Sequence, residues 1–245
     1  MLSAQDTDLG EISLRRRIEP VTGRCVYEAK LDDEFLMSSL FTAAEEAMAD
    51  LALSRLEAAD VLPRSVLVGG LGLGYTAVAA LQHTSVESLT VIEKLQPVID
   101  WHIERLLPCA APLLDDPRTR VVPADFFAAV AAGPASAAVT FGAGPTGQFD
   151  AVLLDIDHAP DHVLAGSHKG FYTSTGLRQL RGLLRPGGVF ALWSDREPDQ
   201  QFAERLAEVF IGVEAEVVSF ANPLTRSVSA NTVYLAESPA CSDGS

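Results

Sequence analysis

The 245-residue sequence contains few cysteines and no long apolar run. Its three cysteines, Cys25, Cys109 and Cys241, lie far apart and form no CxxC pair, so we expect reduced thiols rather than a disulfide framework. No segment reaches the roughly 18 to 20 consecutive apolar residues that a membrane span needs. The N-terminus has acidic residues before its arginines and no apolar stretch, which is unlike a signal peptide. These absences predict a cytoplasmic protein.

Basic residues are also scarce. The chain has 18 Lys and Arg against 33 Asp and Glu, which gives a formal net charge of −15. Such a field repels phosphate backbones, so binding of nucleic acid would need a concentrated basic face. The basic cluster Arg15-Arg16-Arg17 is expected on an exposed strand instead. We therefore expect no nucleic acid and no membrane as a partner, but a neutral or cationic small molecule.

Short apolar strands alternate with helical stretches from Ser65 onward. The expected strands are 66–68, 89–92, 120–122, 151–154 and 189–193, and the helices after them are 76–82, 95–107, 126–130, 175–184 and 200–210. Repeated strand–helix units imply a parallel sheet with helices on both faces. The stretches 216–220 and 232–236 predict a closing antiparallel hairpin. The fold class is therefore α/β, with a Rossmann-like sheet and a C-terminal hairpin.

The regions around this core are expected to differ from it. Residues 1–38 predict a small β segment, with strands at 11–18, 25–31 and 34–37. A helix follows from Ser39, with Ser38 or Ser39 as its cap, and the main domain is expected over 39–237. Residues 131–147 are small, uncharged and rich in Gly and Pro, which indicates a mobile insertion, a lid or a disordered surface loop. The tail 238–245 is predicted to be disordered.

A glycine-rich turn joins the first apolar strand of the main domain to its helix. Gly70, Gly72 and Gly74 lie between residues 66–68 and 76–82. Glycine lets the backbone turn tightly and approach a ligand without an intervening Cβ. The helix that follows presents free N–H groups at its start. Dinucleotide-binding and adenosyl-binding folds share this feature.

Two further strand ends favour an adenosyl ligand. Glu93 ends the second strand, where a carboxylate can accept both ribose hydroxyls. Asp125 ends the third strand and can accept from an adenine amino group, while Phe126 flanks the ring. A dinucleotide does not require this third position. The glycines, Glu93 and Asp125 together predict a site for an adenosyl ligand.

Residues 65–194 resemble the spermidine/spermine synthase family, a branch of the class I methyltransferase fold. The segments that carry the resemblance are VLVGGLGLGYT, LTVIEKLQPVID, DPRTRVVPADFF, FDAVLLDID and FYTSTGLRQLRGLLRPGGVFALWS. The resemblance implies S-adenosylmethionine or its decarboxylated form as the cofactor, held by Gly70, Gly72, Glu93 and Asp125. It also implies a small N-terminal β domain and a homodimer.

The sequence departs from this family on the substrate side. Leu73 stands in the glycine turn where aminopropyltransferases carry Asp. Asp155 matches the first acid of their D-x-x-D-P segment, but His158 takes the place of the second acid, and their Gln and Tyr-His-Glu residues are absent around 31–39. An apolar Leu73 suits a cofactor that keeps its own carboxylate. The departures therefore favour methyl transfer over aminopropyl transfer.

The densest ionisable cluster is the segment from Asp155 to His162. Asp155 or Asp157 could orient or deprotonate a substrate nucleophile, and His158 could act as general base because its ordinary pKa lies near neutrality. Two alternatives remain open. The cluster could be a solvated loop, or Asp155 or Asp157 could bind Mg²⁺ together with Asp195. We expect catalysis by Asp155, Asp157 and His158 without a metal.

The leading hypothesis is a transferase that uses S-adenosylmethionine on a small-molecule acceptor. Aminopropyl transfer from the decarboxylated cofactor is the second hypothesis. A non-catalytic adenosyl-binding or scaffold protein is the third.

Overall fold

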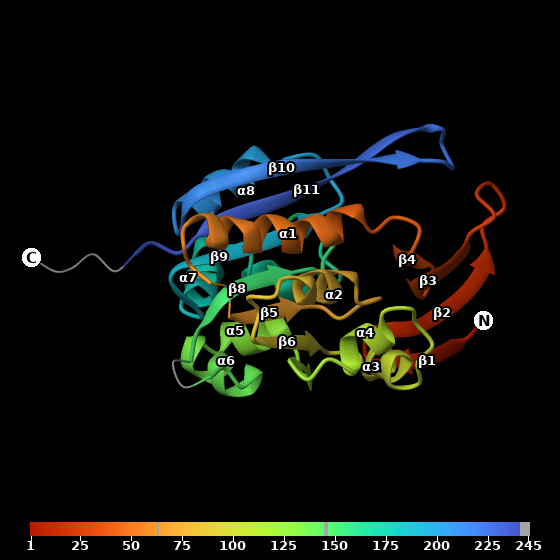
Figure 1. The fold of residues 1–245 in the computed structure, drawn as a ribbon, viewed down its shortest axis with the longest axis horizontal. Helices are drawn as coiled ribbons and strands as arrows, with labels where there is room; N and C mark the ends of the chain where they lie inside the picture. The colour runs from red at the N-terminus through yellow and green to blue at the C-terminus, as the bar shows by residue number, and fades with distance from the viewer. Residues whose placement is uncertain (63, 145–146, 241–245) are drawn as a thin grey trace, which may run out of the picture.

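The computed structural model describes residues 1–62, 64–144 and 147–240 (Figure 1). The chain begins with a four-stranded antiparallel sheet in the order β1-β2-β3-β4. Its strands are β1 (Ser3–Thr7), β2 (Gly10–Ile18), β3 (Cys25–Leu31) and β4 (Glu34–Ser38). The sequence analysis missed β1 because SAQDT lacks apolar alternation. The other three strands lie where they were expected.

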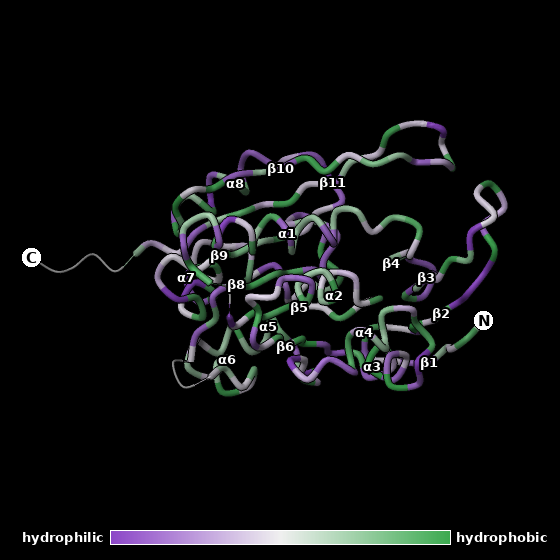
Figure 2. The backbone as a smooth tube through the Cα atoms, viewed as in Figure 1, coloured by the Kyte–Doolittle hydropathy of each residue, from purple (hydrophilic) through white to green (hydrophobic). Residues whose placement is uncertain are grey.

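The second sheet has seven strands in the order β10-β11-β9-β8-β5-β6-β7. They are β5 (Ser65–Gly69), β6 (Ser88–Glu93), β7 (Thr119–Pro123), β8 (Phe149–Leu154), β9 (Leu184–Ser194), β10 (Ile211–Asn222) and β11 (Ser227–Glu237). Strands β5 to β9 pair in parallel, and β11 runs antiparallel to both β9 and β10. The predicted α/β fold with a terminal hairpin is confirmed. The central strand β8 is buried along its whole length and is apolar except for Asp150, because helices cover both faces of the sheet (Figure 2).

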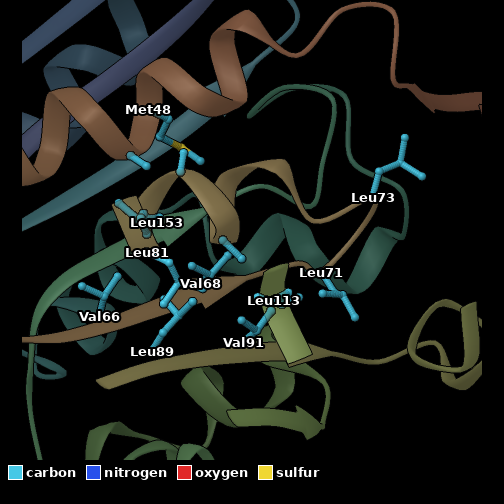
Figure 3. Close-up of a cluster of buried hydrophobic side chains, with 14 of the residues drawn as sticks. Met48, Val66, Val68, Leu71, Leu73, Leu81, Leu89, Val91, Leu113 and Leu153 are labelled. Atoms are coloured by element: carbon cyan, nitrogen blue, oxygen red, sulfur yellow. The ribbon is translucent and has the colours of Figure 1, made fainter. Parts of the chain in front are cut away.

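Two helical layers cover the second sheet. The helices are α1 (Ala43–Ala58), α2 (Tyr75–Gln82), α3 (Gln96–Ile103), α4 (Ala110–Leu114), α5 (Phe126–Ala131), α6 (Pro134–Phe141), α7 (Ser174–Arg181) and α8 (Gln200–Ala207), with a 3₁₀ turn η1 (Gly166–Gly170). Buried side chains of α1 to α4 form one apolar cluster with the sheet, which includes Met48 and Val68 (Figure 3). Buried side chains of α5 to α8 form the other.

The N-terminal sheet shares the first of these clusters. Ile12 and Leu14 of β2 are fully buried in the same apolar group as Met48 of α1. The sheet lies at the same end of the molecule as the turn of the β10–β11 hairpin (Figure 1). The division into 1–38 and 39–237 stays a prediction, although the first sheet does end at Ser38.

Several expected helix boundaries are wrong. The helix expected over 95–107 stops at Ile103, because Arg105 has a positive φ of 59°, and a separate short helix α4 follows. The helix expected over 175–184 stops at Arg181, since Leu184 already pairs in β9. The cap prediction for α1 is also wrong. The Ser39 Oγ accepts from the Tyr27 N–H instead, and the helix begins after Thr42.

The expectation that residues 131–147 form a lid or a loop is also wrong for the described part of this segment. Its described part contains the helix α6, whose Ala137 and Phe141 are fully buried in the second apolar cluster. Arg120 donates to the carbonyl of Gly142 at 2.9 Å and also to that of Phe141. The small residues of this segment allow α6 to pack closely against the second apolar cluster instead of forming a lid. Residues 145 and 146 of this segment lie outside the described residues.

The remaining expectations concern charge, thiols and the tail. Arg15 and Arg17 lie on β2 and form ion pairs with Glu28 of β3. Neither Cys25 nor Cys109 is in a disulfide, and Cys241 lies outside the described part of the chain. Of the tail 238–245, Ser238 still donates to Gly188 at 2.8 Å, and residues 241–245 are not described. In the described residues, no helix has both the length and the apolar character to cross a membrane.

Candidate active site

Two cavities meet at the carboxyl ends of the parallel strands. We call them the Glu45 cavity, of about 270 Å³, and the Glu93 cavity, of about 80 Å³. Both are bounded by residues of the N-terminal sheet, the glycine turn and the segment after β8. The residues that line both are Leu36, Met37, Gly72, Asp155, Ile156 and Leu164. Ligands of open α/β sheets bind at this edge.

The glycine turn forms part of the walls of both cavities. At two of its glycines, other protein atoms occupy the position that a Cβ would take. Gly70 and Gly74 both have a φ of +96°. A Cβ on Gly70 would lie 2.1 Å from the Asp155 carbonyl oxygen, and one on Gly74 would lie 2.9 Å from the Cys109 Cβ. The sequence analysis explained these glycines by the close approach of a ligand. At Gly70 and Gly74, close packing of the protein itself also requires glycine. Gly72 lines both cavities and fits that reason better.

Glu93 ends β6 and lines the smaller cavity, as the sequence predicts. Its Oε2 accepts from the Leu71 N–H at 3.1 Å, and its Oε1 accepts from the Leu95 N–H at 2.8 Å. Burial raises the pKa of this carboxyl group, and the backbone donors oppose that rise. The backbone N–H groups of Gly72 and Lys94 also act on this carboxylate, so the protein's own backbone holds it in place at the wall of the cavity.

Asp125 and Phe126 lie across the same cavity from Glu93. The Asp125 Oδ1 caps α5 by accepting from the Ala128 N–H at 2.9 Å, and its Oδ2 lies 3.6 Å from the Lys94 Nζ. Lys94 also forms an ion pair with Asp8 of the β1–β2 turn at 2.9 Å. Phe126 is almost fully buried and stacks on Phe141 with a centroid distance of 5.5 Å. Of the residues predicted to bind the cofactor, all except Gly74 line this cavity, and Gly74 lines the Glu45 cavity instead.

Asp155 stands where the two cavities meet. Its backbone N–H donates to the Gly69 carbonyl at 2.8 Å, which fixes it beside the glycine turn. Its Oδ2 accepts from the Thr76 Oγ1 at 2.9 Å. Burial raises the pKa of Asp155 to about 6, and the Thr76 hydroxyl opposes that rise.

Glu45 is a site residue that the sequence analysis missed. It lies in the first turn of α1 and lines the larger cavity together with Asp155. Burial, together with the negative charge of Asp155, raises the pKa of Glu45 to about 8. Nothing in the sequence distinguishes Glu45 from Glu46. Only the packing of α1 across the sheet brings one of the two to Asp155.

Asp157 lies outside both cavities. It is 2% exposed and accepts three hydrogen bonds of 2.8 Å, from the Leu164 N–H, the Tyr172 hydroxyl and His168. These contacts hold the loop between β8 and α7. The catalytic role expected for Asp157 stays a prediction, and its geometry favours a structural role.

His158 does line the Glu45 cavity. Its Nε2 lies 3.3 Å from the Glu34 Oε1 of β4, and its Nδ1 lies 3.8 Å from the Asp195 Oδ2. The alternative Mg²⁺ site needed Asp195 beside Asp155 or Asp157. Asp195 approaches His158, and Asp157 is held elsewhere. The described part of the chain contains no group of three His, Cys, Asp or Glu side chains that could hold a metal ion.

Aromatic rings form much of the remaining wall of the Glu45 cavity. They come from segments far apart in the sequence, namely Phe35, Phe41, Tyr75, Trp193 and Phe220. Phe41 contacts Phe220 with a centroid distance of 5.5 Å, which joins the start of α1 to the β10–β11 hairpin. Carboxylates and aromatic faces both attract cations. The cavity therefore has the chemistry to bind a small cationic molecule.

The sequence comparisons point to enzymes of polyamine chemistry. The chain is 32% identical to a polyamine aminopropyltransferase from Aeropyrum pernix over 128 residues, which cover 52% of this chain and 36% of that protein. It is 27% identical to putrescine N-methyltransferase 1 from Nicotiana tabacum over 155 residues, 61% of this chain and 36% of that protein. The matches thus span little more than a third of these relatives. No protein-family model matches the chain.

The fold comparisons agree. Spermidine synthase from Thermotoga maritima superposes with a TM-score of 0.70 at 19% identity, covering 96% of this chain and 72% of that one. Human methyltransferase-like protein 13, solved in complex with SAH, gives 0.55 at 19% identity, covering 83% and 85%. These neighbours define a class I methyltransferase fold. The sequence relatives and these fold neighbours agree with the resemblance to the spermidine synthase-like family.

Proposed function

We propose that this protein is an S-adenosylmethionine-dependent methyltransferase that acts on a cationic amine. The Glu93 cavity would hold the adenosyl group, and the Glu45 cavity would hold the acceptor. The observation that carries the proposal is the position of Asp155, which lines both cavities and has a pKa raised to about 6 by burial. A carboxylate at the junction can accept a proton from the attacking amine.

The residues of the smaller cavity fit an adenosyl group. The Glu93 carboxylate would accept from the ribose hydroxyls and Asp125 from the exocyclic amine, and the same cavity has apolar walls such as Val98 and Phe126. The cavity of about 80 Å³ is smaller than the roughly 300 Å³ of typical small-molecule sites. Leu36 and Met37 of β4 line it, and an adenosyl group would fit if such flexible side chains moved aside. When bound, the cofactor supplies a methyl group activated by its sulfonium.

The larger cavity fits an amine. The Asp155 carboxylate and the surrounding rings would attract the acceptor as an ammonium ion, and the neutral Glu45 carboxyl group would accept a hydrogen bond from it. An ammonium ion has no lone pair for attack, so it must lose a proton first. At neutral pH, Asp155, with its pKa of about 6, is largely ionised, whereas Glu45, with its pKa of about 8, is largely protonated. Asp155 is therefore the base, and the Thr76 hydroxyl orients it.

Aminopropyl transfer is the second candidate. The observation that favours it is the 32% identity to the Aeropyrum pernix aminopropyltransferase. Leu73 weighs against it, because this buried side chain stands in the glycine turn where that chemistry uses an acid. The homodimer implied by the resemblance stays a prediction.

The two chemistries differ in the mass that they add to the product. Incubation with a panel of amines and either S-adenosylmethionine or its decarboxylated form, followed by mass spectrometry, separates them. We expect a methyl adduct, and an aminopropyl adduct would favour the second candidate. Binding of a cofactor without any product would support a non-catalytic adenosyl-binding protein instead.

Asp155→Asn tests the role of the proposed base. This variant should lose most of its turnover and keep its affinity for the cofactor. Asp161→Asn is the matched control, because Asp161 is exposed and pairs with Arg196 outside both cavities. Equal activity in the two variants would contradict the assignment of Asp155.

A further inference from the structure

The peptide between Gly72 and Leu73 is held in one orientation by a buried histidine. His102 of α3 is completely buried, and its Nε2 lies 3.0 Å from the Gly72 carbonyl oxygen. Its Nδ1 is also buried and has no hydrogen-bond partner among the described residues. An unpaired buried N–H costs more than an unpaired lone pair, so the proton belongs on Nε2. Burial also lowers the pKa of His102, which keeps the ring neutral. His102 therefore donates to Gly72.

Two other contacts fix the same turn. Glu93 accepts from the Leu71 N–H on one side of the peptide. On the other side, a Cβ on Gly74 would lie 3.0 Å from the His102 Cε1, so the imidazole packs directly against that glycine. The turn is thus fixed from Leu71 to Gly74, and a rotation of the Gly72–Leu73 peptide would break the bond to His102.

The orientation of this peptide decides where the Leu73 N–H points. In a planar trans peptide, the N–H of one residue points opposite to the C=O of the residue before it. The Gly72 carbonyl points at His102 in the core, so the Leu73 N–H points away from it. This N–H has no hydrogen-bond partner among the described residues, although Leu73 is 5% exposed. Gly72 and Leu73 both line the Glu45 cavity, and Gly72 also lines the Glu93 cavity. A buried donor of this kind requires an acceptor.

We infer that His102 is a positioning residue that presents the Leu73 N–H to the carboxylate of the bound cofactor. This inference rests on the proposed function. The acceptor would be the anionic oxygen at the methionine end of the cofactor, opposite the adenine that Asp125 would bind. The interaction selects S-adenosylmethionine over its decarboxylated form, because the latter has no carboxylate to accept this bond. Leu73 therefore contributes to cofactor binding through its backbone N–H. Its apolar side chain adds no negative charge that would repel the cofactor carboxylate.

Variants at His102 test this inference by calorimetry with both cofactor forms. His102→Leu removes the donor, and His102→Gln keeps an N–H near the position of Nε2. We expect His102→Leu to weaken binding of S-adenosylmethionine by roughly ten- to hundredfold, as for a lost hydrogen bond to a charged group. Binding of the decarboxylated form should change by less than about threefold. His102→Gln should restore most of the preference, and the KM for the amine should stay unchanged.

A second measurement does not depend on any variant being folded. In wild-type protein labelled with ¹⁵N-leucine, S-adenosylmethionine should shift the Leu73 amide proton downfield, and the decarboxylated form should not. Equal weakening of both cofactor forms by His102→Leu, or equal amide shifts with both, would overturn the inference. Failure of the wild-type protein to bind either form would instead overturn the proposed function.

Discussion

Replacing Glu45 with glutamine should remove a large part of the pH dependence of the protein's stability. The pKa of Glu45 is about 8 in the folded protein and 4.5 as the ordinary value, so the folded state binds more protons between these limits. A raised pKa means that stability is complete below pH 4.5 and is lost as pH rises through 8. Asp155, raised from 3.8 to about 6, acts in the same direction over its own range. Glutamine resembles the protonated form, so Glu45→Gln should not lose stability in this way.

The size of the effect follows from the pKa of Glu45. At about 1.4 kcal/mol per pH unit, a rise from 4.5 to about 8 corresponds to at most about 5 kcal/mol above pH 8. Glu45 faces a cavity and is only partly shielded from water, so solvent screening reduces this figure. We expect Glu45→Gln to exceed the wild type by roughly 1–3 kcal/mol at pH 9 and to equal it near pH 4.

Urea unfolding at pH 4, 7 and 9 measures this difference. Glu46→Gln is the matched control, because Glu46 lies in the same helical turn, is exposed, and loses the same charge. The control accounts for the general benefit of removing one negative charge from a chain of net charge −15. If the difference between the two variants does not change with pH, Glu45 does not have a raised pKa and the reasoning is refuted.

Three further predictions concern neighbouring residues. Thr76→Val removes the hydroxyl that donates to Asp155, so the pKa of Asp155 should rise above about 6. The pH at which activity falls on the acid side of the pH–rate profile should rise with it. If that pH does not change, Asp155 is not the base. Gly70→Ala places a Cβ 2.1 Å from the Asp155 carbonyl oxygen at a φ of +96°, so it should lower the free energy of unfolding by several kcal/mol in a urea titration. Gly144→Ala is the control. Gly144 has open space around it, so this variant should be nearly as stable as the wild type. Phe126→Ala should cost about 3–5 kcal/mol by urea unfolding. The exposed Val139→Ala should stay within about 0.5 kcal/mol, and similar costs for these two variants would contradict the burial of Phe126.

Local patterns were sufficient for most of the fold. Mainly apolar runs of three to five residues located the parallel strands, because strands covered on both faces are mostly apolar. Boundaries were less accurate where tertiary contacts override local preference. Ser39 does not cap α1, since its hydroxyl accepts from Tyr27 of β3. The segment 131–147 has the composition of a loop, yet Phe141 packs into the core and makes part of it a helix.

The cofactor side of the candidate site was also predictable from sequence. Gly72, Glu93 and Asp125 follow the ends of successive parallel strands, and parallel strands place their carboxyl ends at one edge of the sheet. Because β5, β6 and β7 are neighbours in the sheet, their carboxyl ends bring these residues together. The same logic located Asp155 after β8, at the junction of the two cavities.

On the acceptor side the sequence predicted Asp155 and His158, and the tertiary structure determined the rest. Glu45 and Phe220 reach the same cavity because α1 crosses the sheet and the β10–β11 hairpin folds back beside it. Asp157 looked equivalent to Asp155 in the sequence, but its side chain points into a buried network with His168 and Tyr172. No local pattern encodes such placements, since they depend on how elements far apart in the chain pack against one another. The sequence thus determined the fold and one half of the site, and packing determined most of the other half.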